Sequence, residues 1–176
     1  IDNQSVISVS VNLGSEDGDA LSSVVFPFSP LESSVVAPVS SPQHLHLTPD
    51  ETLVVNDGLT IDRSEILSGN GEIDGSVENH GIISPGNSPG SQTVNGDLTL
   101  AADGALSIEI AGVGAGQFDQ ANVTGVAKLG GTLRITLLGS PNLQVGDSFQ
   151  ILTFGSSTGE FLKYENLAIG NNLYLD

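Results

Sequence analysis

Short apolar segments separated by glycine occupy the middle of the chain. Six glycines fall between positions 69 and 90, and the apolar segments between them are only one or two residues long. An interior glycine destabilises a helix by roughly 1 kcal/mol relative to alanine, and Pro85 and Pro89 cost more. The pattern therefore predicts short strands that turn every few residues and coil through successive rungs of a β-solenoid. The apolar segments are Ile73, Val77 and Ile82–Ile83.

Similar turn and strand elements recur about every 20 residues, near Leu53, Ile73 and Thr93. This interval is close to the length of a solenoid rung. We predict a glycine-rich solenoid, or rolled sheet, over about 50–112. In its last strand, in the sequence ALSIEIAG, apolar and polar residues alternate, which predicts one buried face and one solvent-exposed face. The side chains of the buried face would be Leu106, Ile108 and Ile110.

Longer alternating strands follow over 113–176. Turns at Gly130–Gly131 and Val145–Asp147 separate them. This pattern favours an antiparallel, sandwich-like β unit that is stacked on the end of the solenoid and shares its core. The fold class is therefore all-β. The expected strands are 121–124, 127–129, 132–138, 148–154 and 172–175.

The first 49 residues are rich in serine, valine and proline. Proline cannot donate a backbone hydrogen bond within a central strand, and it keeps the preceding residue extended. We therefore expect an extended segment over 1–49. Its β-branched stretch, Ser5–Leu13, has the shape of a strand that completes an exposed sheet edge. We hypothesise that it pairs with an adjacent subunit and links copies head to tail in an open chain. Packing within the same chain is the alternative. The strand residues are Val6, Ile7, Val9, Val11 and Leu13.

The charge of the chain is sparse and one-sided. It has 21 acidic and four basic residues, and no lysine or arginine precedes Arg63. A surface of this sign repels phosphate backbones and anionic lipids, which argues against nucleic-acid binding and peripheral membrane attachment. No apolar run approaches the about 20 residues that cross a bilayer, so we expect no membrane insertion of this chain.

Cysteine and methionine are both absent. The lack of cysteine excludes a disulfide scaffold and thiol chemistry, while remaining compatible with export. Because the chain begins at Ile1 and contains no methionine, we expect a processed or excised piece. The low charge and the abundance of serine, threonine, glycine and asparagine favour an exported bacterial protein, located outside the cell or at its surface.

Several longer runs carry a resemblance to a known family. They are GNGEIDGSVENHGIISPGNSPGSQTVNGDLTL, LSIEIAG, QFDQANVTGVAKLGGTLRITLL, VGDSFQILTF and GEF. The region of about 69–161 resembles the repeat-rich, β-helical passenger and stalk regions of autotransporter-like adhesins and related exported proteins of cyanobacteria and proteobacteria. The resemblance implies that these residues shape turns and strand ends, and it carries over no catalytic residue. The best-matched pieces are Ser84–Gly86 with Ser88–Gly90, Phe118–Gln120, Leu129–Leu133 and Gly146–Phe149.

Two groups of residues could supply some of the ligands of a metal site. His44 and His46 are two apart, so a strand would place both on one side. A simple ribbon position is favoured because no third ligand is near in the sequence. Glu16, Asp17 and Asp19 supply hard oxygen ligands, but calcium needs six to eight of them and the distal glutamate of the full loop pattern is missing. A solvated acidic turn is the favoured interpretation, with calcium as the alternative and no other cofactor expected.

Carboxylate pairs raise the question of glycoside chemistry, which needs two acids about 5–10 Å apart in a cleft. Glu72 and Asp74 would share one side of a strand, and Asp57 and Asp62 could lie on neighbouring rungs. The chain has no tryptophan for a sugar platform, and its serines lack a nucleophile elbow. We therefore expect no enzyme and no catalytic residue, and we assign His80 to a turn.

These observations predict a non-enzymatic, extracellular structural protein. It would be a self-associating subunit of a bacterial surface filament, stalk or layer, and its partners would be further copies of itself, with a cell-surface polysaccharide as the second candidate. The alternative is an adhesin or carbohydrate-binding module. A sugar site needs exposed aromatic rings, for which Tyr164 and Tyr174 are the candidates.

Overall fold

The computed structural model describes residues 6–8, 24–25, 34–35, 44–170 and 173–175, and within these ranges it contains strands and turns but no helix. Three parallel sheets contain most of the strands, and we number them in the order in which each complete coil, from β4 onward, visits them. Sheet 1 consists of β4 (His44–Leu47), β7 (Ile66–Gly69), β10 (Ile82–Pro85), β13 (Ala105–Ile110), β16 (Thr132–Leu137) and β19 (Lys163–Glu165). Sheet 2 consists of β1 (Val6–Ser8), β5 (Thr52–Val54), β8 (Glu72–Asp74), β11 (Ser91–Asn95), β14 (Gln120–Val123) and β17 (Leu152–Thr153). Sheet 3 consists of β6 (Leu59–Ile61), β9 (Val77–Asn79), β12 (Leu98–Leu100), β15 (Val126–Leu129) and β18 (Ser156–Gly159).

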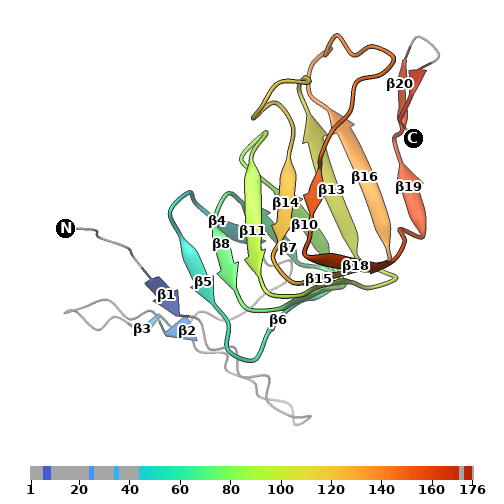
Figure 1. The fold of residues 1–176 in the computed structure, drawn as a ribbon. Helices are drawn as coiled ribbons and strands as arrows, with labels where there is room; N and C mark the ends of the chain where they lie inside the picture. Colours follow the sequence, from blue (N-terminus) through green and yellow to red (C-terminus); the bar gives the residue numbers. More distant parts are fainter. Residues whose placement is uncertain (1–5, 9–23, 26–33, 36–43, 171–172, 176) are drawn as a thin grey trace.

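The chain winds through these sheets as a three-sided β-solenoid. Each coil contributes one strand to sheet 1, then one to sheet 2 and one to sheet 3, so every strand lies beside its equivalent in the next coil. Figure 1 shows the strands of sheet 2 side by side in front, those of sheet 1 behind, and β15 and β18 closing the base. The five complete coils begin at β4, β7, β10, β13 and β16, and β19 begins a sixth.

The core is a set of rows in which each coil stacks an apolar side chain on the same position of the coil before. One row runs through sheet 1 and includes Leu67, Ile83 and Leu106. Leu67, Ile73 and Leu106 have no exposed surface. The period-2 alternation of the strands turns these side chains inward and leaves the intervening polar residues outside. The predicted buried face of β13 is confirmed: Leu106, Ile108 and Ile110 are all buried.

Glycine is required where the backbone of one coil approaches the next closely. Gly69 ends β7 with φ +101, and a Cβ at this position would overlap the carbonyl oxygen of Leu47 in the preceding coil. Gly75 has φ +142, and its Cβ would overlap the carbonyl oxygen of Val55. Only glycine combines this backbone conformation with this lack of space. The glycine-rich stretch of the sequence therefore marks the tight corners of the solenoid.

The all-β solenoid predicted from the sequence is confirmed, but it extends over both predicted boundaries. Its complete coils begin at His44, inside the segment 1–49 that the sequence predicts to be extended, and its parallel strands continue to Glu165. The antiparallel, sandwich-like unit predicted for 113–176 is wrong, because β14 to β19 all pair in parallel with the preceding coil. The turn at Gly130–Gly131 joins strands of two different sheets, whereas an antiparallel hairpin would make those strands neighbours.

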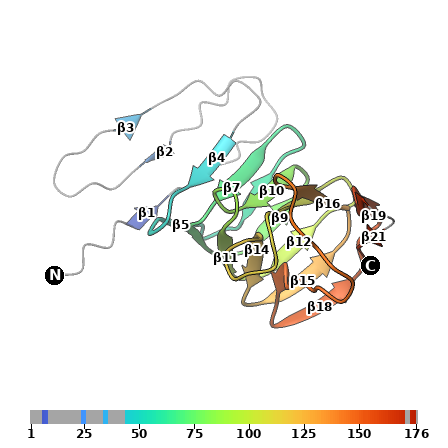
Figure 2. The ribbon, with the colours of Figure 1, turned by 90° about the horizontal axis from the view of Figure 1, so that it is seen from above.

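Two short antiparallel pairs stand apart from the solenoid sheets. They are β2 (Val24–Val25) with β3 (Ser34–Val35), and β20 (Ala168–Gly170) with β21 (Leu173–Tyr174). Figure 2 shows β1, β4 and β5 at one end of the molecule and β18, β19 and β21 at the other. The solenoid axis therefore runs from the N-terminal to the C-terminal end of the described chain.

Candidate functional site

Three polar side chains meet at the outer face of sheet 1 in the first two coils. The Oγ of Ser68 lies 2.7 Å from Nε2 of His44 and 2.8 Å from Nδ1 of His46, and the two rings are edge to face with centroids 5.9 Å apart. The prediction that both imidazoles face one side is confirmed. In the part of the chain that the structure describes, no group of three histidine, aspartate or glutamate side chains could hold a metal ion. The pair therefore has no third ligand among these residues.

A serine beside an imidazole is also the arrangement of a base-activated nucleophile. Such a nucleophile needs a third group that orients the base, and the contacts found for His44 and His46 are with Ser68 and with each other. Ser68 is itself buried, with 8% of its surface exposed. The trio forms a polar contact between β4 and β7.

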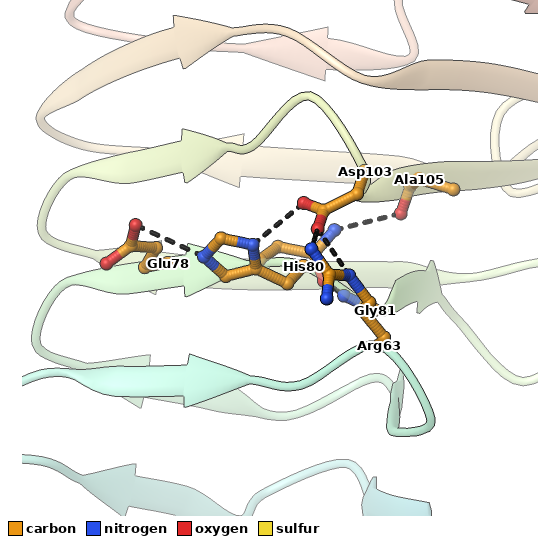
Figure 3. Close-up of polar contacts among 7 residues, drawn as sticks. Arg63, Glu78, His80, Gly81, Asp103 and Ala105 are labelled. Carbon is orange, nitrogen blue, oxygen red and sulfur yellow. Dashed lines mark hydrogen bonds and ion pairs between the residues drawn. The ribbon is translucent and has the colours of Figure 1, made fainter.

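A second polar cluster lies at the corner between sheets 3 and 1 (Figure 3). Nδ1 of His80 lies 2.7 Å from Oδ1 of Asp103, Nε2 of His80 lies 3.3 Å from Oε1 of Glu78, and the guanidinium of Arg63 lies 2.6 Å from Oδ2 of Asp103. The turns of three successive coils supply Arg63, His80 and Asp103. His80 lies in the β9–β10 turn, as predicted.

The contacts in this cluster favour the charged forms of His80 and Asp103. The hydrogen bond to Asp103 raises the pKa of His80, and the same bond, with that from Arg63, lowers the pKa of Asp103. Both ring nitrogens of His80 face carboxylates, so the ring offers no free lone pair to a metal or a substrate proton. The cluster joins consecutive coils at the solvent-exposed surface.

Beneath this corner lies a buried amide, Asn79, which sequence reasoning missed. Its Nδ2 donates to the carbonyl oxygen of Ala105 over 3.1 Å, and its Oδ1 accepts from the backbone nitrogen of Gly81 over 3.1 Å. It has no exposed surface. The alternation Val77, Glu78, Asn79 already places its side chain inward, and this was the signal in the sequence.

A buried carboxylate, Asp119, also escaped the sequence analysis. Its Oδ1 accepts from the backbone nitrogen of Gly90, and its Oδ2 accepts from that of Glu109, each over 2.8 Å. Burial raises the pKa of Asp119 to about 6, with a smaller contribution from the charge of Glu109, while the two backbone hydrogen bonds oppose the rise. Asp119 thereby joins the β10–β11 loop to the end of β13 at the corner between sheets 1 and 2.

The four carboxylates considered for glycoside chemistry lie at exposed positions in the first two coils. Glu72 and Asp74 point outward from β8 and are exposed. The expectation that Asp57 and Asp62 lie on neighbouring rungs is wrong, because the two residues flank β6 within one coil.

Most of the other predicted site residues lie outside the described part of the chain. These are the calcium candidates and three of the strand residues, namely Glu16, Asp17, Asp19, Val9, Val11 and Leu13. Val6 and Ile7 lie in β1, whose backbone pairs in parallel with β5 of the same chain.

The C-terminal end of the solenoid exposes apolar side chains. Tyr164 continues the inward row of sheet 1 beyond Leu133, yet it is 52% exposed, and its ring packs edge to face on Phe161 with centroids 6.0 Å apart. Leu162 is 68% exposed and Phe154 is 44% exposed. These side chains are core-type residues that no described coil covers.

The chain was compared with protein-family models, with curated proteins and with solved structures, and none of these comparisons finds a match. Within the described ranges, no helix has the length and apolar character needed to span a membrane. The assignment of function therefore rests on the geometry of the solenoid.

Proposed function

We propose that this protein is a non-enzymatic, extracellular structural protein that associates with copies of itself, as a building block of a bacterial surface filament, stalk or layer. The observation that carries this proposal is the open-ended architecture. Among the described residues, each of the three sheets ends at both extremities in a strand that is paired on one edge only. Such edges are templates for pairing with a further chain, and folded proteins usually cover them.

The character of the polar clusters supports a structural role. His44, His46 and Ser68 contact one another between two strands, and His80 bridges Glu78 and Asp103. In each cluster, hydrogen bonds between these side chains connect one coil to the next. The few aromatic residues and the excess of acidic groups fit an extended, soluble scaffold that avoids non-specific association.

Sedimentation velocity over a wide range of protein concentrations tests this proposal. We expect a series of species that grows beyond the dimer as concentration rises, because an open, heterologous contact does not close on itself. A chain that sediments as a monomer even at millimolar concentration would rule out self-association as its task.

A second function, carbohydrate binding, is favoured by one specific observation. Tyr164 presents half of its surface to solvent beside Phe161, and exposed aromatic rings are what a sugar platform needs. A glycan array tests it: binding in the micromolar range that is lost in Tyr164→Ala would favour the adhesin. Binding that survives this substitution would exclude this pair of rings as the sugar site.

A further inference from the structure

At each end of the solenoid one sheet extends one strand beyond the complete coils, and it is a different sheet at each end. Sheet 1 extends one strand past the last complete coil, through β19, and sheet 2 extends one strand before the first complete coil, through β1. If a second copy is placed end to end with the first, its β4 follows β19 and its β1 follows β17. Both extensions are matched, and two of the three sheets continue without interruption. Sheet 3 leaves the width of one strand between β18 and the next β6.

We propose that the occupant of the exposed C-terminal end face is the N-terminal end of a second copy of this chain, stacked coaxially so that sheets 1 and 2 run from one copy into the next. This inference rests on the proposed self-association and specifies its interface. By end face we mean Phe154, Leu162 and Tyr164 together with the free edges of β17 and β19.

The side-chain rows of sheet 1 match across this junction. The register of β19 on β16 places Tyr164 in the inward row that begins at Leu45. Continuing the same register, Tyr164 meets Leu45 of the second copy, which is half-buried in the free chain. An exposed ring and a half-exposed aliphatic side chain thus cover each other, as neighbouring coils do inside the solenoid.

The outward rows match as well. In the same register, Glu165 of one copy faces His46 of the next, and Lys163 faces His44. Glu165 is held in its charged form by Lys163, at 2.5 Å, and by Arg134, at 2.8 Å. The junction therefore sets a carboxylate beside an imidazole in the row next to the apolar contact.

The distribution of charge selects a head-to-tail orientation. The first coil, residues 44–65, carries five carboxylates against one cation, a net charge of −4 with the histidines neutral. Residues 126–170 carry three cations and three carboxylates, a net charge of zero. Joining two N-terminal ends would place two strongly negative faces together, whereas head-to-tail stacking places a negative face against a neutral one. The three cations are Lys128, Arg134 and Lys163.

Cysteine cross-linking tests the proposed register directly, because the natural chain contains no cysteine. The test variant is His44→Cys with Lys163→Cys, which changes two exposed, outward-facing positions. Within one chain these residues are five strand spacings apart, about 24 Å, and a disulfide needs Cα atoms within about 7 Å. We expect oxidation to produce a reducible ladder of linear multimers. The matched control is Thr60→Cys with Lys163→Cys, which places the first cysteine on sheet 3 of the same end and should give no ladder.

A charge substitution on the end face provides a second readout. We expect Leu162→Glu to weaken self-association by at least about tenfold, since it removes a leucine from the junction and adds a negative charge opposite the acidic first coil. Val113→Glu is the control, because Val113 is a comparably exposed apolar residue in the β13–β14 loop. It should leave association unchanged.

The two proposals fail in different ways. If the unmodified protein associates but the His44 and Lys163 pair gives no ladder, or the control pair gives one instead, the coaxial junction is wrong and self-association stands. Equal effects of Leu162→Glu and Val113→Glu would also overturn the junction. If the unmodified protein never associates, the proposed function falls together with the inference.

Discussion

Replacing Asp119 by asparagine should change how stability depends on pH. In the folded protein the pKa of Asp119 is about 6, and the ordinary value is 3.8. Between these values the folded state holds a proton that the unfolded chain has lost, so the free energy of unfolding falls as pH rises through this window. The shift corresponds to about 3 kcal/mol between the two protonation states. About 2 kcal/mol of this falls between about pH 4.5 and about pH 7.5.

The variant Asp119→Asn cannot titrate and lacks this pH-dependent contribution. It also loses the oxygen that accepts from the backbone nitrogen of Glu109, which should cost about 1–3 kcal/mol at every pH. The variant should therefore be markedly less stable than the natural protein at low pH, and the difference should shrink by about 2 kcal/mol on going to neutral pH.

Urea unfolding followed by far-ultraviolet circular dichroism at several pH values measures this difference. Comparison with the variant is needed because other carboxyls change the free energy of unfolding with pH in the opposite direction. The contacts of Asp103 with His80 and of Glu165 with Lys163 lower the pKa values of these two carboxyls, so the stability they contribute is lost as pH falls. A difference between variant and natural protein that stays constant with pH would refute the reasoning, as would an Asp119 carboxyl that titrates below pH 4 by NMR.

Three further substitutions probe the corners and the core, each by urea unfolding. Asn79→Ala leaves two buried backbone groups without their side-chain partner and should lower the free energy of unfolding by about 2–4 kcal/mol. Asn95→Ala, at an exposed strand position, should lower it by less than about 0.5 kcal/mol. Equal losses in the two variants would contradict the role of the buried amide. Gly69→Ala should destabilise more than Gly139→Ala, because both positions have positive φ but only Gly69 lacks space for a Cβ, and the reverse order would contradict the close approach of the coils. Leu106→Ala removes a fully buried side chain and should cost about 2–5 kcal/mol, so a loss under about 1 kcal/mol would show a loosely packed core.

The sequence predicts the class of the fold well because a solenoid repeats its local signals. The recurrence near Leu53, Ile73 and Thr93 corresponds to β5, β8 and β11, which lie side by side in sheet 2. The alignment is wrong by one residue, since Val94 rather than Thr93 lies beside Ile73. Alternation resolves this offset, because it turns Val94 inward and Thr93 outward.

The C-terminal half was mispredicted because alternation does not reveal which strand is the neighbour. Alternation is typical of antiparallel sheets, which often have one solvent-exposed face. The parallel sheets of this solenoid also have one exposed face, so their strands show the same pattern. The period also lengthens: Val94 pairs with Val123, 29 residues further on, and Ala121 pairs with Leu152, 31 residues further on. The loops between sheets 1 and 2 grow along the chain, from 70–71 to 138–151, and they conceal the repeat.

The buried polar residues differ in how far the sequence could have revealed them. Asn79 falls on an inward position of an alternating strand, so a closer count of that strand would have found it. Asp119 follows a loop, and its partners at Gly90 and Glu109 come from two other segments of the chain. Its role depends on the stacking of coils with loops of unequal length, which local patterns do not contain. The exposed end face likewise becomes apparent only when Tyr164 is placed in its row.

X-ray fibre diffraction from the assembled, oriented protein tests the central claim most directly. Coaxial stacking adds six strand levels per copy, so the account predicts an axial repeat of about 29 Å together with a strong reflection near 4.8 Å along the fibre axis. Strands that lie along the fibre axis, or an axial repeat that is not close to six strand spacings, would contradict end-to-end stacking of the solenoid.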